Sequence, residues 1–223
     1  MTASLPQPGS TPRTRVKRIP EKAVTDRAVA YSILDAGLVA HVAVVTDGQP
    51  YVVPVGYARR GDEVIFHGSS ASRLFKTLAA GAPTCLTVTL LDGLVLARSL
   101  FESSMHYRTV MALGSCRQLD GDEEIAALLD LSEVLMPGRS AEARHPAPQE
   151  LKATITLALA LDEISVKVSE RPPEDLPEDL VDPVYSAIWA GWVPIRESFG
   201  EPFADELAAG IPVPDYVTRW RRA

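Results

Sequence analysis

Glycine-containing turn signals divide the middle of this 223-residue chain into short runs of β-branched and aromatic residues. The signals are Asp47-Gly48, Arg60-Gly61-Asp62 and Asp92-Gly93. Short loops of this kind join antiparallel strands, because parallel strands need a long crossover. We therefore expect a three-stranded meander over residues 38–68 and two strand-like runs around Asp92-Gly93. Two long apolar runs, residues 106–119 and 151–169, are also expected to be strands.

Helical periodicity appears in three places. The first is the segment after Thr25, which we expect to cap a helix ending at Gly37. The others are residues 71–80 and the acidic-start segment 120–136. One helix, residues 71–80, lies between the third and fourth strands, and the elements show no βαβ alternation. The pattern predicts a mainly β (α+β) fold, a small barrel of six antiparallel strands with flanking helices.

Composition is consistent with one globular domain that carries tails. Hydrophobic residues make up 46% of the chain and the mean hydropathy is +0.04. We expect a basic, flexible leader over residues 1–22, the barrel domain over 23–170, and an acidic and aromatic extension over 171–223 that packs on the barrel or on a partner subunit. No apolar run approaches the roughly 18 residues of a membrane span, and no signal-peptide pattern is visible, so the expected location is cytoplasmic, without a membrane partner.

The formal net charge of -7 argues against a nucleic-acid-binding protein, which usually has a basic face. Basic residues are nevertheless concentrated in the leader, which is either a solvated tail or an arm laid over an acidic neighbouring subunit. Cys85 and Cys116 are too far apart for a CxxC pair and lie in apolar runs, so we expect two buried thiols.

The stretch from Phe66 to Lys76, "FHGSSASRLFK", places small polar residues and two cations between a strand and a helix. Gly68 and Ser69 belong to the turn, Ser72 can donate a hydroxyl proton to a phosphate, and Arg73 and Lys76 supply charge one helical turn apart. A phosphate site fits these residue types. The alternative is that Ser69 or Ser70 only caps the helix while the two cations extend into water.

Other catalytic motifs are missing from the sequence. The four histidines lack HxxxH or HExxH spacing, so no metal site is expected. Neither a GxSxG elbow nor a GxGxxG fingerprint is present, which disfavours a serine hydrolase and a Rossmann dinucleotide site. An enzyme of this sequence would have to rely on a cofactor for its chemistry.

Several blocks together resemble, in order and spacing, the flavin-nucleotide-binding branch of the pyridoxamine 5'-phosphate oxidase-like superfamily, which includes nitroimidazole reductases. The blocks are "ILDAGLVAHVAVVTDGQPYVVPVGY", "FHGSSASRLFK", "LLDGLVLARSLFESSMHYRTVMALG", "MPGR" and "WAGWVPI". The resemblance covers residues 25–195 and implies an FMN-binding split barrel of six antiparallel strands. It also implies a homodimer that holds the flavin in clefts between the subunits.

The resemblance assigns candidate residues by position. The phosphate segment corresponds to Ser72, Arg73 and Lys76, next to Gly68 and Ser69. The strand beside the isoalloxazine edge corresponds to Val53, Pro54 and Val55, and His67 is placed toward the cofactor cleft, with substrate positioning or proton transfer as its expected catalytic role. Residues near the cofactor or the dimer interface correspond to Tyr107, Arg108 and the C-terminal aromatic Trp189. His106 departs from the family pattern, where asparagine is expected, and this departure affects the substrate pocket more than the flavin.

These observations favour an FMN-dependent oxidoreductase that takes electrons from NAD(P)H and passes them to a small aromatic or nitro compound. The principal alternative is a flavin- or haem-binding carrier or sensor without turnover. A deazaflavin coenzyme ranks lower, because its longer anionic tail would need more cations along the cleft. The pyridoxamine 5'-phosphate oxidase reaction itself is not implied.

Overall fold

The structure is a computed structural model that describes residues 5–220. Its strands are β1 (Val39–Thr46), β2 (Gln49–Arg60), β3 (Glu63–Ser69), β4 (Pro83–Leu96), β5 (Ser104–Ser115), β6 (Arg117–Leu119), β7 (Thr154–Ala160), β8 (Glu163–Ser169) and β9 (Gly191–Pro194). Its α-helices are α1 (Arg27–Ala36), α2 (Arg73–Ala79), α3 (Gly121–Leu135), α4 (Pro148–Lys152), α5 (Pro177–Val181) and α6 (Asp215–Thr218). Short 3-10 helices are η1 (Pro20–Lys22), η2 (Arg139–Ala141) and η3 (Glu206–Ala208).

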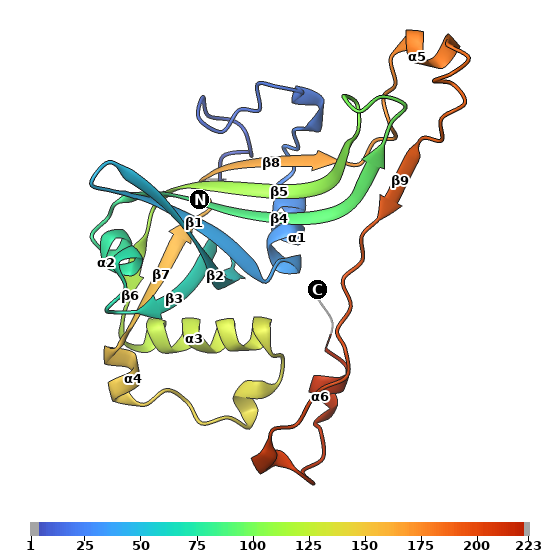
Figure 1. Cartoon of the computed structure of the whole chain (residues 1–223). Coiled ribbons are helices and arrows are strands. Elements are labelled where there is room, and N and C mark those ends of the chain that lie inside the picture. The colour runs from blue at the N-terminus through green and yellow to red at the C-terminus, as the bar shows by residue number, and fades with distance from the viewer. Residues whose placement is uncertain (1–4, 221–223) are drawn as a thin grey trace.

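The strands form one curled antiparallel sheet in the order β6-β7-β3-β2-β1-β4-β5-β8, with β9 added beside β4 (Figure 1). The predicted split barrel with flanking helices is confirmed, although the described residues contain nine strands where six were expected. β2 explains the split. Its first eight residues pair with β1 and its last four pair with β3, so one long strand links the two parts of the sheet.

Two strand predictions need correction. The two runs around Asp92-Gly93 are one continuous strand, β4, in which these residues form a β-bulge where a turn was expected. Residues 151–169 were expected to be one strand and are two, β7 and β8, with a sharp reversal at residues 161–162. The predicted helix cap also shifts by one residue, because Asp26 accepts the hydrogen bond from the Ala28 amide.

The inner face of the sheet carries the main hydrophobic core. Alternate residues such as Val42, Val88 and Val110 are completely buried there. Helices α1 and α2 pack into the same core, α1 through Ile33 and Leu34. The Tyr57 hydroxyl donates to the Leu34 carbonyl at 2.5 Å, which satisfies a polar group at the end of α1 inside the core.

Within residues 5–220, a helix covers the outer face at one corner. Ala127 and Leu131 of α3 pack there against Ala58 of β2 and Ile65 of β3, in a second, smaller core (Figure 1). This arrangement defines the two faces of every strand by alternation, because successive side chains of a strand point to opposite sides.

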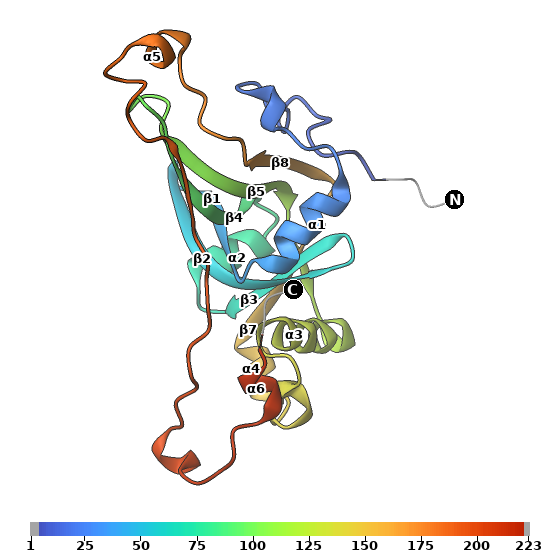
Figure 2. The ribbon, with the colours of Figure 1, turned by 90° about the vertical axis from the view of Figure 1, so that its right-hand side faces the viewer.

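Both ends of the described chain contact the barrel. The Gly9 amide donates to the Ile164 carbonyl of β8, and Arg13 pairs with Glu163, so the leader lies on its own barrel. The C-terminal extension runs from α5 through β9 and along the side of the barrel to α6 (Figures 1 and 2). Among residues 5–220, none of the helices has the length and apolar character needed to cross a membrane.

Candidate functional site

The predicted phosphate segment connects β3 to α2 at one end of the barrel. Gly68 lies directly under the Phe75 ring of α2, and a Cβ atom at this position would be 2.1 Å from that ring. A glycine is therefore required for α2 to pack so closely on β3. This contact fixes the position of the residues that begin the helix.

The serines of this turn do not have the helix-capping role that the alternative interpretation gave them. Ser72, and not Ser69 or Ser70, occupies the N-cap position, and its hydroxyl makes no capping hydrogen bond. The Ser69 hydroxyl accepts a hydrogen bond from the Ala71 amide. The Ser72 hydroxyl is consequently left available for another acceptor at the start of the helix.

Arg73 and Lys76 are exposed, and among residues 5–220 neither of them bonds to a carboxylate. The Arg73 guanidinium lies 4.1 Å from the centre of the Tyr51 ring, a cation-π contact that orients the group without neutralising it. Every other arginine of residues 23–170 bonds to a carboxylate or a carbonyl oxygen. An unneutralised cation pair in an acidic chain, with a hydroxyl at its side, fits a phosphate group.

His67 and Pro54 lie on the outer face of the sheet. Ile65, two residues before His67, packs against α3 on that face, and strand alternation places His67 on the same side. Pro54 is exposed there, opposite His41 of β1. Desolvation by the surrounding protein lowers the pKa of the His67 imidazole although part of the ring reaches solvent. The neutral imidazole is therefore the dominant form at pH 7, able to accept a proton or to bind a metal ion.

Val53 and Val55 point to the opposite, inner face of β2, where Val55 packs against the main core. Their side chains are therefore not available on the face that carries Pro54 and His67. On the outer face this segment offers a ligand its main chain and the side chain of Pro54.

Tyr107, Arg108 and Trp189 lie far from α2, toward the end of the molecule formed by the β4–β5 hairpin and β9 (Figure 1). Arg108 forms two hydrogen bonds to Asp92, at 2.9 and 2.7 Å, so its charge is already paired. Tyr107 lies on the outer face beside Leu91 of β4. Trp189 is 66% exposed and packs over Gly191.

The unexpected histidine of this region has a structural contact. His106 is buried, its Nε2 atom is 2.8 Å from the Arg171 carbonyl oxygen, and its ring lies 5.8 Å from the Trp192 ring. These contacts fix the chain after β8 and support β9. His106 therefore does not point into an open pocket.

The structure brings together one group of predicted residues and separates another. Ser69, Ser72, Arg73 and Lys76 share the β3–α2 turn, whereas Tyr107, Arg108 and Trp189 form a distant group. Sequence reasoning missed two partners, Tyr51 under Arg73 and Asp92 on Arg108. No local signal could have found Tyr51, because its contact joins separate elements, and Asp92 was assigned to a turn.

Comparisons with known proteins agree with this fold. The model of the family described as pyridoxamine 5'-phosphate oxidase matches residues 26–168. The "FAD and Heme binding protein" of Mycobacterium smegmatis has 42% identity and a TM-score of 0.83, over 88% of this chain and 96% of that one. The "Flavocytochrome Anf3" of Azotobacter vinelandii has 37% identity and a TM-score of 0.89, over 98% and 100% of the two chains.

A more distant structure shares the fold alone. A putative 5-nitroimidazole antibiotic resistance protein of Bacteroides thetaiotaomicron has 19% identity and a TM-score of 0.57, over 66% of this chain and 86% of that one. Curated protein sequences give no match. With most of its barrel matched by the family model and two relatives aligned over nearly their whole length, the chain belongs to the pyridoxamine 5'-phosphate oxidase-like family.

Proposed function

We propose that this protein binds a flavin nucleotide at the interface of a homodimer and acts as a flavin-dependent oxidoreductase. The observation that carries the proposal is the cation pair Arg73 and Lys76, which no carboxylate neutralises among residues 5–220, beside the free hydroxyl of Ser72. Keeping two such cations on an acidic protein is favourable when an anion binds between them.

In this proposal Ser72, Arg73 and Lys76 hold the flavin phosphate, and the ring lies along the main chain of β2 at Val53–Val55. A flavin bound here would supply the redox chemistry between a reduced nicotinamide and a small aromatic or nitro compound. His67 lies on the outer face, as Pro54 does, and is neutral at pH 7, so it is suited to hold or move a proton at a ring nitrogen.

A second chain completes the site. Tyr107 points to the outer face near the start of β5, and Trp189 precedes β9, which pairs with residues 93–96 of β4, whereas Arg73 begins α2, just before the other end of β4. When two copies pack through their outer faces, Tyr107 of one copy is brought toward Pro54 and His67 of the other. This accounts for the division of the predicted residues into two groups.

The name of one relative bears on the form of the flavin. The initial expectation was FMN, and the protein of 42% identity is named for FAD. Both nucleotides carry the phosphate that the cation pair would bind. We propose FAD as the preferred form, because this chain covers 96% of that relative and therefore includes the segments around its site.

A second candidate is haem binding, in a carrier or flavocytochrome role. Two relatives of 42% and 37% identity are named for haem or as a flavocytochrome. His67 fits an axial ligand, because its imidazole is neutral and, within the described residues, makes no hydrogen bond or ion pair. The haem would add a one-electron centre beside the flavin.

The absorbance spectrum of freshly purified protein tests both functions. We expect flavin absorbance bands in the blue region of the visible spectrum, which NAD(P)H bleaches. We also expect a Soret band, which His67→Gln removes while the flavin bands remain. Acid-released flavin is identified by chromatography as FAD or FMN. Purified protein that is colourless and takes up neither added flavin would refute flavin binding, and a Soret band that persists in the variant would exclude His67 as ligand.

A further inference from the structure

Residues 195–213, here called the C-terminal arm, are attached to the barrel at both ends. At the first end β9 pairs with β4, and the Ile195 amide donates to the Asp92 carbonyl at the bulge. At the other end Tyr216 of α6 packs on Gly138, and its hydroxyl donates to Glu142 at 2.9 Å. The arm is therefore held in place by contacts at both of its ends.

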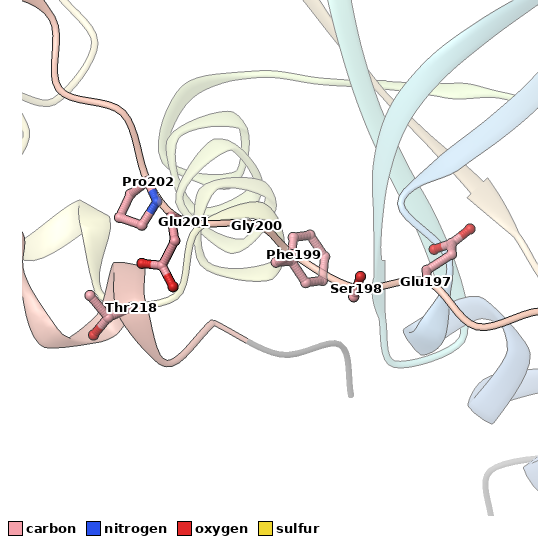
Figure 3. A pocket seen from close by; sticks show the side chains of 7 residues that line it. All are labelled: Glu197, Ser198, Phe199, Gly200, Glu201, Pro202 and Thr218. Atoms are coloured by element: carbon pink, nitrogen blue, oxygen red, sulfur yellow. The ribbon is translucent and has the colours of Figure 1, made fainter.

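Between these attachments every residue from 196 to 213 is exposed except Ala208, and Phe199 contacts Trp220 with ring centroids 3.9 Å apart. Within the described residues, the backbone from Ser198 to Val213 makes hydrogen bonds only inside the arm. Figure 3 shows residues 197–202 laid out in a line. Together with Thr218 they line a cavity of about 530 Å³, and all of these residues belong to the C-terminal segment.

Large apolar side chains of the arm are almost completely exposed. Phe203 is 98% exposed and Leu207 is 92% exposed, and Phe199, Ile211 and Val213 are exposed as well. Single exposed apolar residues are ordinary, but several in one segment held at both ends mark an interaction surface.

The outer face of the sheet beside the arm is also uncovered and has no charged residue on β1, β4 and β5 or on residues 49–58 of β2, since Arg60, at the end of β2, pairs with Glu123 of α3. The residues that point outward on these strands are Val39, His41, Ala43, Val45, Pro50, Val52, Pro54, Cys85, Thr87, Thr89, Leu91, Tyr107, Thr109, Met111 and Leu113. Val45 and Val52 are 61% and 62% exposed. A sheet face without charges is typical of a surface buried in a permanent assembly.

We propose that the C-terminal arm is a clasp for a second copy of this chain, closing over it when the two uncharged faces meet. The inference rests on the dimer of the proposed function and adds the segment that holds it. The arm is rooted on β4, a strand of the uncharged face, so the two surfaces are continuous.

Charge also favours a second copy over an unrelated protein. The arm carries Glu201, Asp205 and Glu206, and the leader carries exposed Arg15 and Lys17, none of them in an ion pair among residues 5–220. The chain thus provides both members of a complementary pair, as a two-fold interface requires.

Photocrosslinking tests the clasp in the full-length protein. Benzoylphenylalanine replaces Phe203 in one sample and Gln149 of α4, an exposed residue away from the arm, in the control, and chains with two different affinity tags are coexpressed. We expect crosslinked species that carry both tags at position 203 and not at position 149. A sedimentation experiment on Phe203→Ser with Leu207→Ser should show a dimer dissociation constant raised at least tenfold.

The outcomes separate the clasp from the dimer itself. A stable dimer without crosslinks between copies at position 203, or a double variant with an unchanged dissociation constant, would overturn the clasp and leave the two-chain flavin site intact. A monomer at all concentrations would overturn both the clasp and the dimer, while flavin binding is still judged from the spectrum.

Discussion

Arg73 illustrates how an unpaired charge can be more informative than a paired one. The arginines on either side of it in the barrel domain, Arg60 and Arg98, are occupied by carboxylates. Arg73 instead rests on the Tyr51 ring, which keeps the guanidinium in place without neutralising it. The residue is thus oriented for a ligand in advance, which reduces the entropy lost on binding.

Replacing Arg73 and Lys76 together by alanine should weaken flavin binding by about 2 to 4 kcal/mol, since two charge-assisted contacts are lost and their effects are not fully additive. This corresponds to a roughly 30- to 900-fold higher dissociation constant, measurable by fluorescence titration of the apoprotein. The matched control is Arg18→Ala with Lys152→Ala, which removes the same charge from exposed sites. Equal affinities of the two double variants would place the phosphate elsewhere.

At the residue scale, the sequence predicted the identity of the cations but not their surroundings. Arg73 and Lys76 were visible as a local pattern between a strand and a helix. Whether such a cation is neutralised depends on contacts between distant segments, which is why Arg108, assigned through the family resemblance, proves to be paired with Asp92.

At the element scale, the packing of α2 on β3 determines where the phosphate segment lies. Phe75 is buried between the helix and the sheet, 5.9 Å from the ring of Phe66. Its ring fills the space that a side chain at position 68 would need. The geometry of the segment therefore depends on a glycine that touches no ligand.

Gly68→Ala should lower the free energy of unfolding by about 1 to 3 kcal/mol, because the buried Phe75 ring must shift to admit the added methyl group. The same shift moves α2, so flavin affinity should fall with stability. Urea unfolding monitored by tryptophan fluorescence measures the first effect. Gly56→Ala is the matched control, since its Cβ would contact Leu135 at an ordinary 3.5 Å. An equal loss of unfolding free energy in both variants would contradict the close packing of α2 on Gly68.

The sequence predicted most elements, and its errors have a common origin. Turn signals at Asp47-Gly48 and Arg60-Gly61 correctly mark the ends of β1 and β2. Asp92-Gly93 has the same composition but lies inside β4, because a bulge and a turn both favour glycine and only the partner strands distinguish them. Gly93 is also required there, since a Cβ atom would lie 2.8 Å from the Val193 carbonyl oxygen.

At the scale of the whole molecule, the uncharged outer face makes a monomer an incomplete unit. The reactivity of the two cysteines can report on dimer formation, because the two thiols lie at different positions in the fold. Burial raises the pKa of Cys116 to about 12, so only about one thiol in 10⁴ is ionised at pH 8. Cys85 is half-buried and points to the outer face, where a second copy would cover it.

We therefore expect Cys85 to react with iodoacetamide slowly at concentrations that favour the dimer and faster on dilution, with Cys116 slow throughout. Mass spectrometry of labelled peptides at pH 8 distinguishes the two thiols. Cys85→Ser serves as the control and should abolish the concentration-dependent fraction. A Cys85 rate that is the same at every concentration would count against packing through the outer face.

The length of β4 has a consequence for the solubility of the protein. β4 extends beyond its pairing with β1 at residues 85–87, and residues 93–96 pair instead with β9. Without β9 this part of β4 would be an open sheet edge, flanked by the exposed side chains of Leu94 and Leu96. Open apolar edges pair with one another and start aggregation. β9 therefore protects this edge of the sheet. A chain truncated before Gly191 should aggregate, whether or not it still forms a dimer.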